Sequence, residues 1–284
     1  DYQAGQWSGW YDLLFDVDQM EKKSIETNQP FYTGIAKVLK SIGFMYLVDQ
    51  YNNVPYSKAF DLANNILPTY DKGEVIYADL ISQLDQAVVL FKGINSANIA
   101  SNAGISTADI VYKGNATNWI KFANTQRLKL LLRQSQVSGF NGAAEVAKIV
   151  TNGGGFIGAG ETASVQPTYV VDNGKQNPFW NAYKRLYTGA IADDFNRANN
   201  YVLGKFRNNN DVRYQYFFSA ATTPVSGNTY YGYNFGEILP SSDPYKSINS
   251  SDVAGPGLAK SAGQPQWFFT SVESLFLQAE ATQR

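Results

Sequence analysis

Four carboxylates near the start of the chain, Asp12, Asp16, Asp18 and Glu21, are the densest group of residues that could hold a metal ion. Calcium needs several oxygen ligands that converge, as in a spaced loop with a central glycine. These four residues fall on a predicted helix, where positions 12 and 16 share a face and position 18 does not. We therefore interpret them as a solvated acidic helix face, and no metal site is predicted.

A second acidic group, the pair Asp193 and Asp194, stands at a predicted helix start. Carboxylates there interact favourably with the helix dipole and cap free amides. We predict that they act as N-terminal caps. Carboxylates that are distant in sequence can still converge as the acid and base of a glycoside hydrolase. That alternative stays open, although no catalytic residue is predicted.

The segment Gly153–Gly158 matches the dinucleotide pattern G-x-G-x-x-G. The pattern binds a pyrophosphate only where it follows a strand and opens a helix. Here it follows a predicted helix and continues into a loop. We predict that Gly153 is a C-terminal helix cap, and no cofactor is expected.

Histidine and cysteine are both absent from the 284 residues. Their absence excludes Ser-His-Asp triads, cysteine nucleophiles, zinc sites built on Cys or His, and thiolate-held clusters. Lys and Arg number 23 against 24 Asp and Glu, a net charge of −1. Such a chain has no long-range field for nucleic acid or anionic lipid, so neither is predicted as a partner. No apolar run approaches the ~20 residues of a membrane span, and no signal peptide is visible.

Aromatic residues are abundant, with 19 Tyr, 17 Phe and 5 Trp, and in the second half they lie among Asn and Gly in loop-like segments. Flat rings suit the apolar faces of sugars, and neighbouring amides can bond sugar hydroxyls. The alternative is that the rings form the core of a loop layer. The candidate ligand-binding residues are Trp180, Tyr183, Tyr230, Tyr231, Tyr233 and Asn234.

Hydrophobic periodicity predicts stacked antiparallel helices over the first 150 residues. In the helix near the middle of the chain, Trp119 and Phe122 face inward, and four basic residues between 121 and 133 are expected to point elsewhere. The predicted helices are Trp7–Lys23, Ile35–Tyr51, Glu74–Phe91, Asn118–Gln136 and Ala143–Val150, with Asp71 as an N-cap candidate and Gly93 as a stop.

The composition changes after Thr151, where Gly, Asn, Pro and Tyr become frequent and predict long ordered loops. Only Ala192–Leu203 looks helical there, and two short strands are predicted at Arg213–Ala220 and Thr229–Phe235. A last helix begins near Ser271. We therefore predict a helical scaffold over 1–150, a loop-rich ligand-binding region over 151–270 packed on it, and the start of a further scaffold helix over 271–284. The chain begins at Asp1 and its last helix has no cap, so it looks trimmed at both ends.

Four segments carry a resemblance to a known family. Residues 49–59 (DQYNNVPYSKA) resemble the "YGDxPYSxA" stretch of the SusD/RagB family, and residues 109–128 resemble its "Y-GD…W-KFANSL-LRL" segment. Residues 272–281 (VESLFLQAEA) are similar to its "E-x-x-F-x-x-AEA" helix, and Asn210–Arg213 resembles "NDPR" with Val212 in place of proline. The matches keep the family's order over nearly the whole chain.

The resemblance implies a mainly α fold of tetratricopeptide-like stacked helical hairpins, with long aromatic-rich loops and a few short strands. It also implies a surface lipoprotein of the outer membrane of Bacteroidetes-type bacteria, held by a lipid anchor that this chain lacks. Such a protein captures oligosaccharides, or peptides in RagB-like members, and passes them to a SusC-like TonB-dependent transporter. No family motif transfers a binding residue onto the candidate rings. A pure protein-interaction scaffold is the main alternative function.

Overall fold

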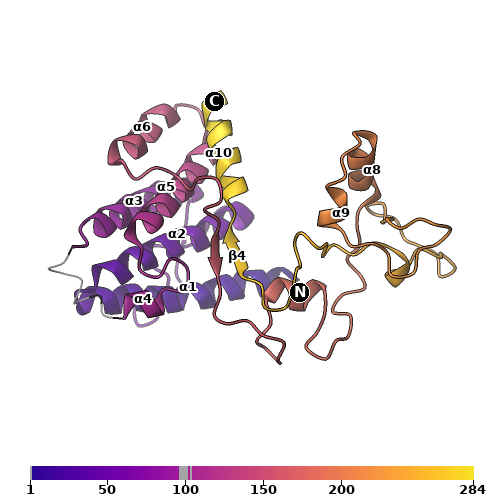
Figure 1. Cartoon of the computed structure of the whole chain (residues 1–284). Helices are drawn as coiled ribbons and strands as arrows, with labels where there is room; N and C mark the ends of the chain where they lie inside the picture. Colours follow the sequence, from indigo (N-terminus) through magenta and orange to yellow (C-terminus); the bar gives the residue numbers. More distant parts are fainter. Residues whose placement is uncertain (1, 96–101, 103) are drawn as a thin grey trace. The chain divides into compact units, whose positions relative to one another are not determined.

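The computed structural model describes residues 2–95, 102 and 104–284. The chain forms two compact units, one of Asp1–Ala163 with Phe268–Arg284 and the other of Ser164–Trp267. Below, they are called the helical unit and the loop unit. The described residues are mainly helical, which confirms the predicted fold class (Figure 1).

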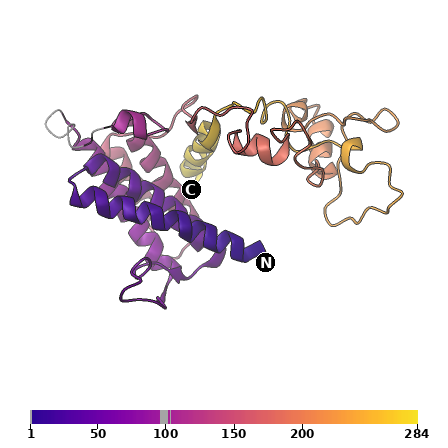
Figure 2. The same ribbon diagram turned by 90° about the horizontal axis from the view of Figure 1, so that it is seen from below.

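The helical unit is a stack of neighbouring helices in which α1 and α2 form an antiparallel hairpin (Figure 2). Helix α2 packs on α1 and α3, α3 packs on α5, and α5 packs on α6 and α10. The helices are α1 (Tyr2–Glu26), α2 (Pro30–Tyr51), α3 (Gly73–Lys92), α4 (Ile105–Ala108), α5 (Ala116–Arg133), α6 (Gly142–Asn152) and α10 (Ser271–Gln283). The five helices predicted in the first 150 residues are thus confirmed, with ends that differ by a few residues.

Two glycines let α2 lie at the centre of this stack. A Cβ atom on Gly34 would stand 2.7 Å from the Phe91 ring of α3, and one on Gly43 would stand 2.7 Å from the Leu14 side chain of α1. Only glycine allows both neighbours to approach the backbone so closely. Contrary to the expectation from sequence, α2 is long and apolar enough to cross a membrane by length and composition. Two thirds of that stretch (67%) is buried inside the protein, as expected of a core helix.

Trp119 of α5 fills the centre of an aromatic cluster and is 1% exposed. Its ring contacts those of Phe91, Tyr112 and Phe122, with centroids 5.3–6.0 Å apart. Its indole N–H donates to the buried Asp109 carboxylate at 2.8 Å, which also accepts three backbone amides between residues 111 and 114. The segment that resembles the family is therefore held together by buried contacts.

A long loop between α2 and α3 is closed by a two-stranded antiparallel sheet of β1 (Val54–Pro55) and β2 (Tyr70–Asp71). Asp71 accepts the backbone amides of Tyr56 and Ser57 at 3.1 and 2.8 Å. The prediction that Asp71 caps α3 is wrong, because its carboxylate fixes this loop and Lys72 precedes the helix. Gly93 does end α3 as predicted.

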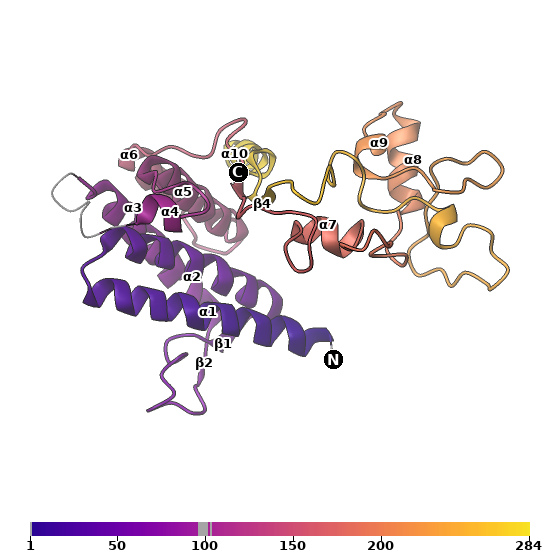
Figure 3. The same cartoon turned by 60° about the horizontal axis from the view of Figure 1, so that its bottom comes forward.

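The loop unit contains three short helices and a 3-10 turn between long loops (Figure 3). They are α7 (Pro178–Tyr183), α8 (Asn200–Asn208), α9 (Tyr214–Phe217) and η2 (Ser247–Asn249). The chain enters and leaves this unit through β3 (Ala163–Val165) and β4 (Gln266–Phe269), which pair as a second two-stranded sheet.

Several predictions for the loop unit are wrong. The helix expected over Ala192–Leu203 begins only at Asn200, because the Asn199 side chain caps it by accepting the amides of residues 201 and 202. Asp193 instead closes a turn by accepting the amides of Phe195 and Asn196. Residues 214–217 form a helical turn where a strand was expected, and Thr229–Phe235 forms only an isolated bridge through its Tyr233.

Of two further predictions, the one for Gly153 is confirmed and the one for the basic residues of α5 is wrong for two of them. Gly153 is the left-handed C-cap of α6 (φ 71°), which confirms that its glycine run ends a helix. Arg127 and Lys129 of α5, expected to point away from the core, are buried instead. Arg127 pairs with Asp85 and Glu145 on neighbouring helices, and Lys129 pairs with Glu273 at 2.7 Å, so buried cations join four helices of the stack.

Candidate functional site

Trp180 and Tyr183 lie on α7, one turn apart and therefore on one side of the helix. Helix α7 starts at this place because Pro178 fits its first turn and the buried Asn177 caps it by accepting the Trp180 amide at 2.9 Å. The Asn177 amide group donates in turn to Gln264 and Gln266 at 3.2 and 3.1 Å. The two rings thus stand on a short helix whose start is anchored in the loop unit.

The other end of α7 is fixed by Lys184. Its ammonium group donates to the Ala254 carbonyl at 2.9 Å, pairs with Asp252 at 3.2 Å and bonds the Ser219 hydroxyl. Tyr183 remains 36% exposed, and its ring lies 5.1 Å from that of Phe179, while Trp180 is partly buried. Tyr183 therefore offers the more accessible ring.

The segment Tyr230–Asn234 is held by backbone bonds on two sides. Tyr233 donates its amide to the Ala198 carbonyl at 2.8 Å, and the Tyr231 carbonyl accepts the Ser251 amide at 2.7 Å. Gly232 sits so close to Ala198 that an added Cβ would lie 1.9 Å from its carbonyl oxygen. The glycine between the tyrosines is thus required by the close approach of two backbones.

The side chains of this segment differ in what they contact. Tyr231 stacks on Tyr245 with ring centroids 3.8 Å apart, and Tyr230 meets Tyr214 edge to face at 5.0 Å. Burial and the nearby Tyr214 raise the pKa of Tyr230. The Tyr233 hydroxyl accepts the Ser247 amide at 2.9 Å, and the exposed Asn234 donates to Glu237 at 2.7 Å. Tyr233 and Asn234 therefore have internal hydrogen bonds that a ligand would have to share.

The predicted site residues thus form two groups within the loop unit, α7 and Tyr230–Asn234. In the part of the chain that the structure describes, no hydrogen bond or ring contact joins one group to the other. Tyr245 and Tyr214, whose rings contact the candidate rings, were not predicted from the sequence. No local pattern marks them, because each lies more than ten positions from its partner.

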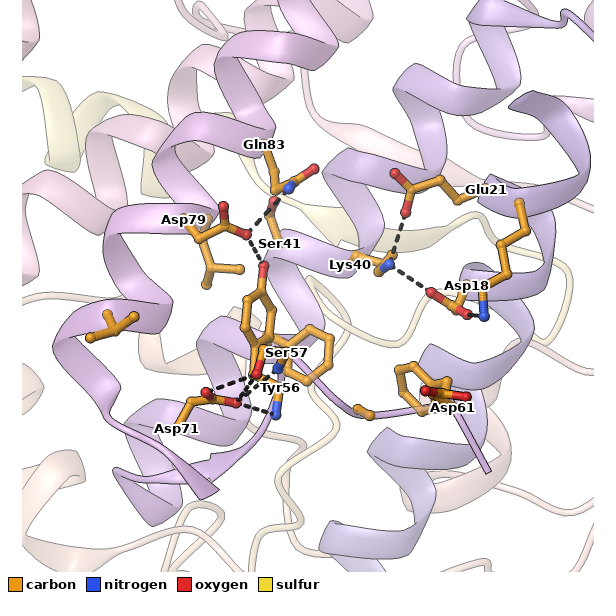
Figure 4. A pocket seen from close by; sticks show the side chains of 16 residues that line it. Asp18, Glu21, Lys40, Ser41, Tyr56, Ser57, Asp61, Asp71, Asp79 and Gln83 are labelled. Atoms are coloured by element: carbon orange, nitrogen blue, oxygen red, sulfur yellow. Dashed lines mark hydrogen bonds and ion pairs between the residues drawn. The ribbon is translucent and has the colours of Figure 1, made fainter. Parts of the chain in front are cut away.

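The helical unit holds a cavity of about 710 Å³ between α1, α2, α3 and the loop after α2 (Figure 4). Its aromatic wall is formed by Phe44, Tyr56 and Phe60. Five carboxylates and two lysines also line it: Asp18, Glu21, Asp61, Asp71, Asp79, Lys22 and Lys40. This cavity was not predicted from the sequence.

Lys40 of α2 joins two buried carboxylates of α1 and lies at the centre of the cavity's ion pairs (Figure 4). Its ammonium group is 2.8 Å from both Asp18 and Glu21. Lys22 and Lys37 complete the group at 2.7 and 2.9 Å. The prediction of a solvated acidic face is therefore wrong for Asp18 and Glu21, which are 7% and 9% exposed, while Asp12 and Asp16 are exposed.

The same contacts set the protonation of these groups. Burial disfavours the charged forms, but hydrogen bonds and charges from Lys22, Lys37 and Lys40 outweigh it and hold the pKa values of Asp18 and Glu21 below their usual range. The pKa of Lys40 is likewise raised, because its two carboxylates outweigh burial. Among the described residues, no group of three or more Asp, Glu, His or Cys has a geometry that could hold a metal ion.

We expect Lys40→Met to lower the free energy of unfolding by about 1–3 kcal/mol near neutral pH, because two buried carboxylates lose a charged partner. Both carboxylates have folded pKa values below the unfolded ones, so their stabilisation is present above about pH 4 and is lost as pH falls through the folded values. The difference between the variant and the wild type should therefore shrink under acid conditions. Urea unfolding at several pH values measures it.

The matched control is Lys23→Met, since Lys23 is 73% exposed and pairs with Glu26 at the surface. We expect that variant to change stability by no more than about 0.5 kcal/mol. A Lys40→Met loss that stays the same in acid as at neutral pH would contradict a role through these carboxylates.

A model of the SusD-like family, described as "starch-binding associating with outer membrane", matches residues 1–284. No curated protein matches the chain.

Solved structures of SusD homologues share this fold. One from Bacteroides uniformis is 26% identical with a TM-score of 0.72, and covers 95% of this chain and 51% of that one. One from Bacteroides fragilis is 24% identical with a TM-score of 0.71, and covers 96% of this chain and 58% of that one. A chitin-binding SusD homologue from Flavobacterium johnsoniae is 22% identical with a TM-score of 0.74, and covers 96% of this chain and 52% of that one.

The chain therefore spans just over half the length of these solved relatives. Because the family model matches from the first residue to the last, the resemblance seen in the sequence is confirmed. The chain belongs to the SusD-like family.

Proposed function

We propose that the protein binds an oligosaccharide without catalysis at the cell surface, through the aromatic residues of its loop unit. Membership of a family described as starch-binding and associating with the outer membrane carries this proposal. The chitin-binding homologue with the same fold is consistent with a glycan ligand. The rings of α7 and of Tyr230–Asn234 are the proposed ligand-binding residues, and residues 151–270 are the proposed ligand-binding region.

The ring chemistry supports this choice of site. Tyr183, Tyr230 and Tyr231 stand at least partly exposed on segments fixed by hydrogen bonds, so their orientation is set before a ligand arrives. Rings held in this way lose little conformational freedom on binding, and they offer flat apolar surface with a polar end. The apolar face of a sugar ring can pack on the flat surface, and its hydroxyls can bond the polar end.

Delivery to a SusC-like TonB-dependent transporter, and anchoring in the outer membrane as a lipoprotein, complete the proposal by analogy with the family. A peptide ligand or a pure interaction scaffold remains the alternative in the same kind of uptake complex. Both alternatives predict no affinity for any glycan.

Native electrophoresis through gels that contain neutral or acidic polysaccharides tests glycan binding. We expect one class of polymer to slow the protein relative to a non-binding standard. The same polymer, incubated with the pure protein and analysed for products, should remain intact. Retardation by no polymer would contradict glycan capture, and released sugars would contradict a binding-only role.

A carboxylate-dependent glycoside hydrolase is less well supported. Its general acid needs a raised pKa. In the carboxylate-rich cavity, the pKa values of Asp18, Glu21 and Asp71 lie below the usual range instead. Burial opposes this shift, but hydrogen bonds and lysine charges outweigh burial.

A further inference from the structure

An apolar groove of about 430 Å³ lies between α1 and the loop that follows β1. Trp7, Tyr11 and Phe15 of α1 line one side, and Leu62 and Pro68 of the loop line the other. The loop is tied to α1 by the Tyr11 hydroxyl, which donates to the Pro55 carbonyl at 2.7 Å. The groove is thus built on a fixed framework.

The loop that lines this groove exposes several apolar side chains. Leu62 is 66% exposed, and the same loop also exposes Ile66 and Leu67 at 80% and 92%, while Tyr70 of β2 is 63% exposed. Clustered exposed apolar residues mark surfaces that bind other proteins, whereas single ones do not.

The groove adjoins the carboxylate-rich cavity, since Ala59 and Phe60 line both. Even when Lys37 and Lys58, whose charges act on Glu21 and Asp71, are counted with the two lining lysines, the five carboxylates exceed the lysines by one. Among the residues that line the groove, Asp12 is the charged one. The chemistry that complements this surface is a positive charge beside an apolar group.

The hydrogen-bond acceptor that remains unused in the cavity also favours a positively charged partner. Asp71 accepts from Tyr56 and Ser57, so these donors are already used, and the Ser57 hydroxyl also donates to Asp71 at 2.9 Å. The Tyr56 hydroxyl donates to one oxygen of Asp79, and Gln83 donates to the same oxygen at 3.2 Å (Figure 4). The other Asp79 oxygen has no hydrogen-bond partner among the described residues.

A cavity whose carboxylates outnumber its lysines, and in which one Asp79 oxygen is a spare acceptor, suits a donor that carries positive charge. Lysine ammonium and arginine guanidinium are such groups, and the Phe44, Tyr56 and Phe60 rings add surfaces that attract a cation. A neutral sugar is less well matched, because it would leave the excess negative charge without a partner.

We propose that this surface docks a segment of a partner protein, which places an arginine or lysine in the cavity and an adjacent apolar side chain in the groove. The proposal does not rest on glycan binding, because it concerns different residues in the other unit. It names a second binding surface on the protein.

The probe is the peptide acetyl-Leu-Arg-Leu-amide, compared with acetyl-Leu-Gln-Leu-amide, in which the positive charge is removed. Two-dimensional NMR follows the indole N–H of Trp7 and the backbone amides of Tyr56 and Ser57. We expect the arginine peptide to shift these signals and to bind about tenfold more tightly than the glutamine peptide, as one charge-assisted hydrogen bond would give.

Two variants locate the two halves of the surface. Asp79→Asn should reduce the preference for arginine several-fold, and Leu62→Ala should weaken both peptides alike without affecting the fold, because Leu62 is largely exposed. The matched control is Asp172→Asn, which removes a carboxylate from the surface of the loop unit and should change nothing.

Equal binding of the two peptides, or no shift with either, would overturn the proposal. A shift of the same signals by maltotriose, without a shift by the arginine peptide, would overturn it too and make the cavity a sugar site.

Discussion

Replacing Trp119 with alanine is expected to lower the free energy of unfolding by about 3–5 kcal/mol, the range for a large aromatic lost from a packed core. Trp119 is 1% exposed and contacts three aromatic rings of the helical unit. The change also removes the indole N–H that donates to the buried Asp109, while three backbone amides keep that carboxylate bonded. Urea unfolding followed by far-UV circular dichroism measures the loss.

The control is Phe235→Ala, since Phe235 is 99% exposed in the loop unit. It should change stability by no more than about 0.5 kcal/mol. If Trp119→Ala cost no more than this control, the aromatic cluster would not be the centre of the core.

Replacing Trp180, Tyr183 and Tyr231 together with alanine is expected to cause the largest loss of ligand affinity. Each ring that is buried against a sugar contributes about 1–3 kcal/mol, so the triple variant should bind at least tenfold more weakly. Isothermal titration calorimetry with oligosaccharides of the polymer that slows the wild type in gels measures the change.

Phe276→Ala in α10 is the matched control, because it removes a ring that is 74% exposed from the helical unit. It should bind like the wild type, and circular dichroism should show that both variants stay folded. A triple variant with unchanged affinity would show that these rings do not form the site.

The helical unit could be predicted from sequence because its helices repeat apolar residues at the spacing that buries one face. In α3, for example, Leu80, Leu84, Val88 and Phe91 are all buried as expected. The burial of Arg127 and Lys129 could not be predicted in this way, because their carboxylate partners lie on other helices.

The loop unit was predicted less well because polar caps and backbone contacts decide its structure. Asn199 sets the start of α8, and Asn177 with Pro178 starts α7 in a segment that was expected to be a loop. Gly232 is explained only by its contact with Ala198, more than thirty positions away. Apolar periodicity carries no information about such contacts.

The candidate rings could be named from sequence, but their surroundings could not. Tyr231 is adjacent in the chain to Tyr230, yet Tyr231 stacks on Tyr245 and Tyr230 meets Tyr214 edge to face. The cavity of the helical unit was missed for the same reason: Lys40 meets Asp18 and Glu21 only when α1 and α2 pack. The spacing of residues along one helix gives no sign of an ion pair between two helices.

Hydrogen–deuterium exchange with and without the bound oligosaccharide tests the central claim most directly, because it locates the ligand along the chain. Glycan capture by the loop unit predicts slower exchange in peptides that cover residues 177–184 and 230–234, with little change in the helical unit. Slower exchange only around residues 56–61, or no change at any peptide, would contradict it.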